Sequence, residues 1–249
     1  MCYIPLYMDR DFKTLGIIVK RENRGERNVL LTLLTPDMGL LDVLSFGGGR
    51  GASSYRAPLY GEGVFSLERK SGTNNCLKDT QIISEHEWVK DSIEKVGWAS
   101  LFSELVIKSR SAESGIYRLY TSVLDSMTDE NVDRNAVYFL IHFLLSEGLS
   151  GDWETCPMCG RRYDEKEILG FSTLSSSAVC SSCDTLSRTL VLPPNARRYC
   201  LRVSQSSLEE ALGFIISDDA ARRISRYLLR SLEYIFPSRL LTIESGLIS

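Results

Sequence analysis

The sequence lacks the residue patterns of several common enzyme classes. It contains no GxxxxGK(S/T) phosphate-binding loop and no GxSxG nucleophile motif, which argues against a P-loop nucleotidase and an α/β-hydrolase. Only two histidines occur in 249 residues, and neither lies in the HExxH pattern of a metalloprotease. His86 and His142 are better explained as capping or core residues. These absences favour a binding protein that has neither enzymatic activity nor a small-molecule substrate.

Long apolar runs are also absent. The longest, residues 136–145, suits a buried helix and is too short for a membrane span. The first sixteen residues contain no basic run followed by an apolar core, so we expect no signal peptide, no membrane association and a cytoplasmic location. The net charge is −3, while residues 1–80 hold eleven basic against nine acidic side chains. This balance permits local nucleic-acid binding without requiring it.

Cysteine is the residue type with an informative pattern. Four of the seven cysteines form two CxxC pairs, Cys156 with Cys159 and Cys180 with Cys183, and Gly160 directly follows the first pair. Four thiolates satisfy the tetrahedral preference of Zn²⁺ and leave no open coordination position. We therefore expect one structural zinc ion per chain, held by these four residues. The alternatives are a redox pair or free buried thiols, and a thioredoxin-like site would need only one such pair.

The remaining sequence predicts an α+β fold. Five short strand-like runs precede residue 85 and suit a small barrel such as an OB-fold: residues 14–20, 28–35, 40–46, 59–69 and 76–84. The rest is helical, and apolar residues recur at helical spacing at Trp98, Leu101, Phe102, Leu105 and Val106. Further helices are expected at 116–127, 134–148 and 220–235. The predicted organisation is a barrel domain at 1–84 and a helical domain at 85–249, with a zinc-finger insert at 151–190.

Basic residues gather in two parts of the predicted barrel. The glycine-rich loop 47–51 is accompanied by two arginines, and the first hairpin turn is also basic. Guanidinium groups beside exposed backbone N–H groups suit phosphate oxygens, and Tyr55 and Tyr60 could stack on bases. The alternative is a solvated basic surface. The candidate DNA-binding residues are Lys20, Arg21, Arg24, Arg27, Arg50 and Arg56.

A second basic cluster lies in the predicted helix 220–235. Its apolar residues share one face, and four arginines lie on the opposite face: Arg222, Arg223, Arg226 and Arg230. Arginine favours bidentate recognition of carboxylates and phosphates, so this face is a candidate partner-binding surface. The alternative is a face that only confers solubility.

Taken together, these features resemble the RecO family of bacterial recombination-mediator DNA repair proteins. The likeness begins with the strand, charged hairpin, strand, TxxxG turn, strand and GxR loop of residues 15–59. It resumes with the two CxxC pairs and with the terminal-helix segment "YLLRSLEYIFPSRLL" at 227–241. The family usually has Gly-Gly before the second cysteine pair, where this chain has serines at 175–177. Its amino-terminal part is also less basic than is usual for the family.

The resemblance implies an amino-terminal OB-fold and a helical domain that carries a zinc-binding insert. It also implies binding of single- and double-stranded DNA, annealing of complementary strands without ATP, and help in loading RecA onto coated single strands. Two protein partners are implied, RecR and the single-stranded-DNA-binding protein. The acidic, apolar-ended tail of the latter would dock on the helical domain, where the arginine face offers cations.

Two other functions are compatible with parts of the sequence. An RNA-binding OB-fold protein would use the same stacking and phosphate contacts, because these do not distinguish the 2′-hydroxyl. A zinc-dependent enzyme would need mixed ligands and an open coordination position, whereas the four candidate ligands here are all cysteine.

Overall fold

The computed structural model describes residues 10–26, 28–46, 57–69, 75–110, 114–150, 152–236 and 238–248. The chain divides into two compact units. The first contains residues up to 87 together with 110–118, and the second contains 88–109 and 119 onward. No helix within the described ranges is both long and apolar enough to cross a membrane.

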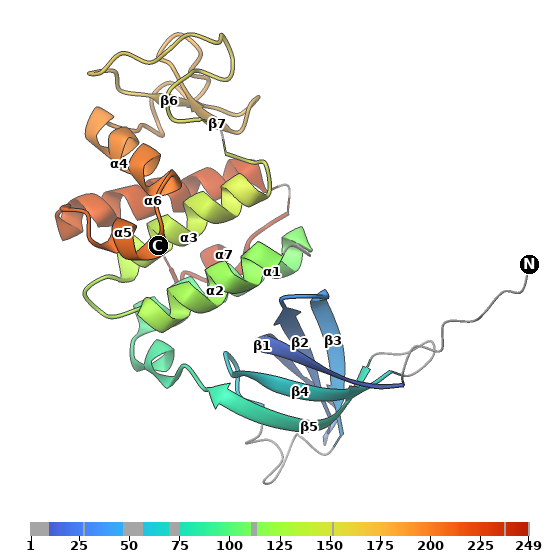
Figure 1. Cartoon of the computed structure of the whole chain (residues 1–249). Coiled ribbons are helices and arrows are strands. Elements are labelled where there is room, and N and C mark those ends of the chain that lie inside the picture. Colours follow the sequence, from blue (N-terminus) through green and yellow to red (C-terminus); the bar gives the residue numbers. More distant parts are fainter. Residues whose placement is uncertain are drawn as a thin grey trace, which may run out of the picture. The chain divides into compact units, whose positions relative to one another are not determined.

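The first unit is a closed five-stranded barrel in the order β1-β2-β3-β5-β4 (Figure 1). Neighbouring strands are antiparallel except β3 and β5, which pair in parallel over a short stretch. All five predicted strands are confirmed, with β1 longer than expected. The strands are β1 (Asp11–Arg24), β2 (Asn28–Thr35), β3 (Gly39–Ser45), β4 (Glu62–Glu68) and β5 (Asn75–Ser84).

Alternating apolar residues fill the barrel interior. Successive side chains of a strand point to opposite faces, so one set from each strand is buried. Gly63 in β4 is required because a Cβ there would lie 2.2 Å from the carbonyl oxygen of Gln81. The buried core cluster consists of Ile18, Val29, Leu31, Leu33, Val43, Ala57, Phe65 and Leu67.

The second unit is built from helices. The four helices expected from apolar periodicity are present, whereas α4, α5, α7 and the short 3-10 helix η2 (Glu87–Asp91) were not predicted. The α-helices are α1 (Ile93–Ser109), α2 (Ser114–Ser126), α3 (Val132–Ser146), α4 (Pro194–Ser204), α5 (Leu208–Leu212), α6 (Asp218–Ile235) and α7 (Leu241–Glu244).

Helix α3 is central to this unit and packs against α1, α4, α5 and α6. Its residues Phe139 and Phe143 are fully buried, and Phe139 stacks on Phe102 of α1 at 3.9 Å between ring centroids. A buried polar contact joins α3 to α6, where the Ser225 hydroxyl donates a hydrogen bond to Asp133. Because α3 is apolar nearly all round, it can be covered by other helices on several sides.

The cysteine-rich segment lies between α3 and α4 and contains little regular structure. Its strands β6 (Gly170–Ser172) and β7 (Ser177–Val179) form a two-stranded sheet (Figure 1). A further bridge between Leu169 and Leu192 closes the segment just before α4. The segment also buries apolar side chains, since Leu169, Phe171 and Val179 are at most 1% exposed. Phe171 lies 5.5 Å from the Tyr234 ring of α6, so the segment is packed onto the helices.

Candidate metal centre and binding surfaces

The first CxxC pair lies in a tight turn. The Gly160 N–H donates to the carbonyl oxygen of Cys156 at 2.8 Å, and the Cys156 N–H donates to the carbonyl oxygen of Arg161 at 2.8 Å. Gly160 has φ +72°, a left-handed conformation that glycine adopts without a steric penalty. The turn therefore aims both sulfurs of the pair toward one side of the chain.

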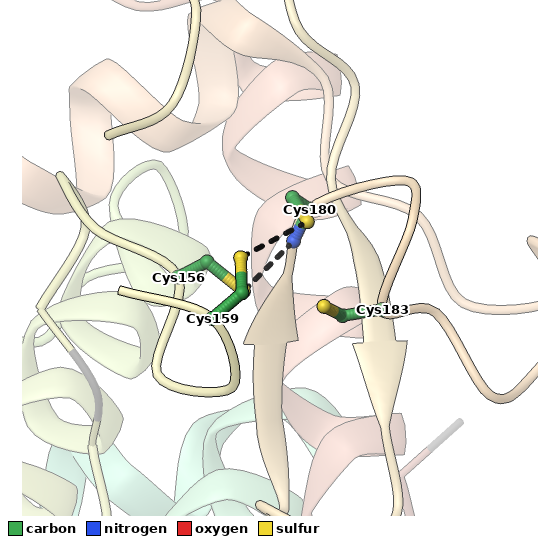
Figure 2. A group of neighbouring side chains, drawn as sticks. All are labelled: Cys156, Cys159, Cys180 and Cys183. Carbon is green, nitrogen blue, oxygen red and sulfur yellow. Dashed lines mark hydrogen bonds between the residues drawn. The ribbon is translucent and has the colours of Figure 1, made fainter. Parts of the chain in front are cut away.

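The second pair repeats this turn after β7. The Cys183 N–H donates to the carbonyl oxygen of Cys180 at 2.9 Å, and the Cys180 N–H donates to the sulfur of Cys156 at 3.5 Å. Figure 2 shows the four side chains converging from the two turns. The prediction that these cysteines lie together is confirmed by the geometry.

The four sulfurs are spaced as a metal requires. All lie within 4.8 Å of one another, and the Cys159 and Cys180 sulfurs are 3.8 Å apart. A tetrahedron with Zn–S bonds of about 2.3 Å has sulfur–sulfur edges of about 3.8 Å. The residues present therefore fit a four-coordinate zinc ion with no vacant coordination position. Such an ion would cross-link the two turns and have a structural role only.

The electrostatics of the cluster also favour a cation. Burial would raise the pKa of the Cys156 thiol, but N–H groups of Cys180, Cys159 and Met158 outweigh it and lower the pKa to about 7. Hydrogen bonding to the neighbouring sulfur of Cys180, together with burial, raises the pKa of Cys183. Hydrogen bonds therefore distribute the protons unevenly between Cys156 and Cys183, and a bound Zn²⁺ would displace them, because a thiol that coordinates zinc is deprotonated.

Carboxylates brace the backbone around the cluster. Glu167 forms a two-point ion pair with Arg161, at 2.9 and 2.5 Å. Asp184 accepts hydrogen bonds from three backbone N–H groups, that of Phe171 in β6 and those of Leu186 and Arg188 after the second CxxC pair. Burial would raise the pKa of Asp184, but these N–H groups lower it below its usual value. Ser176 adopts φ +48°, so the turn between β6 and β7 contains a left-handed residue that is not glycine.

The barrel places three of the predicted DNA-binding residues on a strand instead of in a turn. Lys20, Arg21 and Arg24 are exposed and belong to β1, because pairing with β2 continues to the Arg24–Asn28 pair. Glu22 lies between them and forms ion pairs with Lys20 at 2.6 Å and with Arg24 at 3.2 Å. The Lys20 contact lowers the pKa of Glu22. Lys20 and Arg24 are therefore already paired.

The aromatic residues of this unit differ from those expected. Tyr60 is 2% exposed, and its N–H donates to the carbonyl oxygen of Ile18, so its ring is not available to stack on a base. Phe46, at the end of β3, is 56% exposed. Three predicted DNA-binding residues and one predicted stacking residue lie outside the described part of the chain: Arg27, Arg50, Arg56 and Tyr55.

The arginines of α6 line more than one cavity. Arg223 lines a groove between α4 and α6, whereas Arg222 and Arg226 line a different cavity. Arg222 also forms an ion pair with Asp133 at 3.5 Å. Arg230 is exposed to solvent and lines neither of these two cavities. Helix geometry keeps the four arginines within an arc of about 100°, so the division reflects the segments that flank α6 on either side.

The α4–α6 groove has a volume of about 760 Å³ and combines cations with apolar walls. Arg198 and Arg202 of α4 face Arg223 of α6 across it. Its apolar lining includes Ile216 and Ile224, and it ends at the Val191–Pro193 segment that leaves the cysteine-rich insert. An extended acidic peptide with apolar side chains fits such a groove in both charge and polarity.

Comparison with known proteins connects these features to one family. Residues 90–240, more than half of the chain, match the model described as "Recombination protein O C terminal". The chain belongs to the RecO family. The DNA repair protein RecO of Exiguobacterium sp. is 25% identical over 88% of this chain and 87% of its own length. The corresponding protein of Roseiflexus sp. is 27% identical over 90% of this chain and 80% of its own length.

Within this RecO-family chain, both histidines have structural partners. His142 Nε2 lies 3.0 Å from the carbonyl oxygen of Val203, and burial lowers the pKa of this histidine. His86 is fully buried, with Nδ1 2.8 Å from the carbonyl oxygen of Tyr60. These contacts agree with capping or core roles.

Sequence reasoning missed Arg198 and Arg202 as candidate site residues. They lie four residues apart, so they share a helix face, and Pro194 at the first turn of α4 marks where that helix begins. The sequence "PPNARRYCLR" contains both the proline that begins the helix and the two arginines four residues apart. It was overlooked because α4 was not predicted as a separate helix.

Proposed function

We propose that this protein is a recombination mediator of bacterial DNA repair. It binds single- and double-stranded DNA through its barrel, which we assign as an OB-fold. It anneals complementary strands without ATP and helps load the recombinase RecA onto single strands coated by the single-stranded-DNA-binding protein. The supporting observation is the family match over residues 90–240, preceded by a closed five-stranded barrel. We place this activity in the cytoplasm, at the nucleoid.

The outer face of β1, β2 and β3 is the proposed DNA surface. In OB-folds the strand 2–3 face binds oligonucleotides. The cross-strand pairing puts Lys20 beside Thr32 and Glu22 beside Leu30, which in turn pairs with Leu44. Phe46 extends this face with an exposed ring that can stack on an unpaired base.

Annealing on this face requires charge neutralisation and base exposure, with no covalent step. Lys and Arg side chains reduce the repulsion between two phosphate backbones, and binding weakens as salt rises. The acidic Glu22 limits this effect, because it pairs with Lys20 and Arg24. The described part of the barrel therefore supports modest DNA affinity, to which Arg27, Arg50 and Arg56 are proposed to contribute.

The α4–α6 groove is the proposed site for the acidic tail of the single-stranded-DNA-binding protein. Arg198, Arg202 and Arg223 are placed to pair with tail carboxylates, and the apolar lining is placed to receive the terminal apolar residue. This assignment replaces the continuous stripe of four arginines with one of its members and two arginines of α4. RecR is proposed as a second partner, and one structural Zn²⁺ as the cofactor.

The decisive experiment for DNA binding uses the Glu22→Gln variant. Removing this carboxylate frees Lys20 and Arg24, so affinity for a single-stranded DNA oligomer should increase at low salt. The slope of log K against log salt should steepen by about 0.7 for each additional phosphate contact. Fluorescence anisotropy over a salt series measures both quantities, and Glu26→Gln in the adjacent turn is the matched control.

RNA oligomers of matched sequence in the same assay distinguish DNA binding from the alternative function, RNA binding. Preferential binding of RNA would favour an RNA-processing protein. Equal affinity and slope in the wild type and Glu22→Gln would show that DNA does not contact this face of the barrel. A fluorescence-quenching assay with complementary strands, without nucleotide, then tests whether binding leads to annealing.

A further inference from the structure

The four cysteines of the candidate metal centre differ in their access to solvent. Cys156 and Cys180, the first members of the two CxxC pairs, are at most 1% exposed. Cys159, by contrast, is exposed, and Cys183 is half-buried. A Cβ added at Gly160 would meet no atom of the described chain within 4 Å, so the turn is open to solvent directly after Cys159. The cluster therefore has one edge that a small solute can reach.

The described cysteines outside the cluster lack this access. Cys76 and Cys200 are 5% and 0% exposed, and burial raises the pKa of the Cys200 thiol to about 12. The thiolate is the reactive form of cysteine, and a thiol that coordinates zinc is deprotonated. Cys159 thus combines thiolate character with exposure, the two properties that decide which cysteine an oxidant attacks.

A second sulfur lies close to that of Cys159. The Cys159 and Cys180 sulfurs are 3.8 Å apart and come from different CxxC turns (Figure 2). Because Cys180 is fully buried, a solute in the solvent meets Cys159 first. An exposed cysteine beside a second cysteine that can complete a disulfide is the usual arrangement of a redox-responsive site.

The second CxxC pair is connected to the α4–α6 groove by a short series of contacts. Asp184 directly follows this pair and accepts a hydrogen bond from the Phe171 N–H of β6 at 3.3 Å. Gly170 permits this contact, because a Cβ there would lie 2.3 Å from the carboxyl carbon of Asp184. The preceding residue, Leu169, exchanges two backbone hydrogen bonds with Leu192, at 3.0 and 2.9 Å, and Leu192 lines the groove. A displacement of the second turn is therefore transmitted to one end of the groove.

We propose that Cys159 and Cys180 form a peroxide-sensitive switch that controls this end of the groove. The Cys159 thiolate attacks one oxygen of hydrogen peroxide, the O–O bond breaks, hydroxide leaves and Cys159 becomes a sulfenic acid. The Cys180 thiolate then attacks the Cys159 sulfur and displaces a second hydroxide, which leaves a disulfide. The two thiolates supply the two electrons that reduce the peroxide, and two protons convert the hydroxides to water.

The disulfide removes two of the four ligands of the metal. The two remaining thiolates do not close a tetrahedral site, so the metal is released. The second turn then loosens, and the backbone around Leu192 loses its fixed position. A reducing thiol restores both thiolates, which makes the change reversible. The expected loss of peptide affinity rests on the function proposed for the groove, whereas the disulfide and the release of zinc do not.

The test treats the full chain, loaded with zinc, with hydrogen peroxide and measures released zinc with a chromogenic chelator. Zinc should be released in proportion to the peroxide that is consumed. The first disulfide, mapped by mass spectrometry after alkylation of the free thiols, should join Cys159 to Cys180. Hydrogen exchange of the amides at 190–192 should accelerate by roughly tenfold and stay unchanged in β1 to β5. Dithiothreitol with added Zn²⁺ should reverse these changes.

Two ligand exchanges identify the cysteine that is attacked. Cys159→His removes the exposed sulfur but keeps a zinc ligand, because three cysteines and one histidine also form a structural site. Peroxide should release zinc from this variant at least tenfold more slowly than from the wild type. Cys183→His is the matched control, since it makes the same exchange in the second pair and leaves both Cys159 and Cys180 in place. It should release zinc at the wild-type rate.

The acidic tail peptide of the single-stranded-DNA-binding protein provides the functional measurement. Its affinity for the oxidised chain should fall at least tenfold, or about 1.4 kcal/mol. If the peptide does not bind the reduced chain, the function proposed for the groove is wrong, and the disulfide map, zinc release and exchange still decide on the switch. Equal zinc release from the wild type and Cys159→His would overturn the proposal. A first disulfide that excludes Cys159, or unchanged exchange at 190–192 after zinc release, would also overturn it.

Discussion

The barrel and the cysteine-rich insert are stabilised in different ways. The barrel has five strands of 7 to 14 residues that enclose a cluster of eight buried residues. The insert has two strands of three residues each, braced by carboxylates and four converging sulfurs. A hydrophobic core supports the first region, whereas we propose that the second depends on a metal ion and on its packing against the helices. This difference predicts separate responses to metal removal and to core substitution.

The largest expected effect comes from breaking the metal centre. Cys159→Ser removes one of four ligands, and structural zinc contributes on the order of 10 kcal/mol or more to folding of such sites. The zinc content should fall from about one equivalent to below a tenth. Amide protection measured by hydrogen exchange should be lost across 152–192 and kept in β1 to β5.

Cys200→Ala is the matched control for this substitution. Cys200 is fully buried in α4 and lies outside the four-sulfur cluster, so the variant should retain zinc and the protection of the insert. Loss of protection in the barrel of Cys159→Ser would show that the two regions do not fold independently.

A core substitution in the barrel should destabilise the barrel and leave the cysteine-rich insert and its zinc content unchanged. Phe65 is fully buried in the cluster, and Phe→Ala changes of this kind cost about 3–5 kcal/mol through lost burial and a residual cavity. Denaturant unfolding should show that loss for the barrel transition, with zinc content unchanged. Ile83→Ala on β5, where the side chain is 66% exposed, should change stability by less than about 0.5 kcal/mol. Zinc release from the Phe65→Ala variant would contradict the expectation that the barrel and the insert are stabilised separately.

A smaller, pH-dependent effect is expected in the helical unit, outside both regions. Glu104 accepts hydrogen bonds from the N–H groups of Leu241 and Thr242 at 2.7 and 2.9 Å. Burial would raise the pKa of Glu104, but these N–H groups and Lys108 lower it below 4.5. A lowered pKa in the folded state stabilises the protein above pH 4.5, and this contribution is lost as pH falls through the lowered value.

Glu104→Gln tests this pH dependence. The variant should lose about 1 kcal/mol near neutral pH, and the difference from the wild type should shrink below pH 4.5. Hydrogen-exchange rates of the α7 amides measure this loss of stability at the site itself. A difference that stays constant down to acid pH would show that the carboxylate charge does not hold α7 in place.

Much of the fold was readable from the sequence because the apolar periodicity is strong. Short strand-like runs separated by polar turns located all five barrel strands, and the spacing from Trp98 to Val106 located α1. The three-residue strands β6 and β7 are too short to show a period. Helix α4 lies in the part expected to be helical after the insert, but its bounds were not predicted, because it directly follows two prolines.

The metal site was more predictable than the charged surfaces. Two CxxC pairs bring their sulfurs together through local turns and one return of the chain. The pairing of Glu22 with Lys20 and Arg24 depends on how far β1 extends, which the hairpin composition did not reveal. The division of Arg223 from Arg222 and Arg226 depends on which segments flank α6, and a helical pattern alone does not contain that information.

We propose that the barrel binds DNA and that the helical unit, supported by zinc, binds the acidic tail of the single-stranded-DNA-binding protein. The most direct test measures both affinities, for a single-stranded DNA oligomer and for the tail peptide, before and after zinc is removed. The Val191–Pro193 segment forms one end of the groove and is tied to the insert through the Leu169–Leu192 bridge. Zinc removal should therefore weaken peptide binding at least tenfold, or about 1.4 kcal/mol, and leave DNA affinity within about twofold. Equal losses of both affinities, or a loss confined to DNA, would contradict the account.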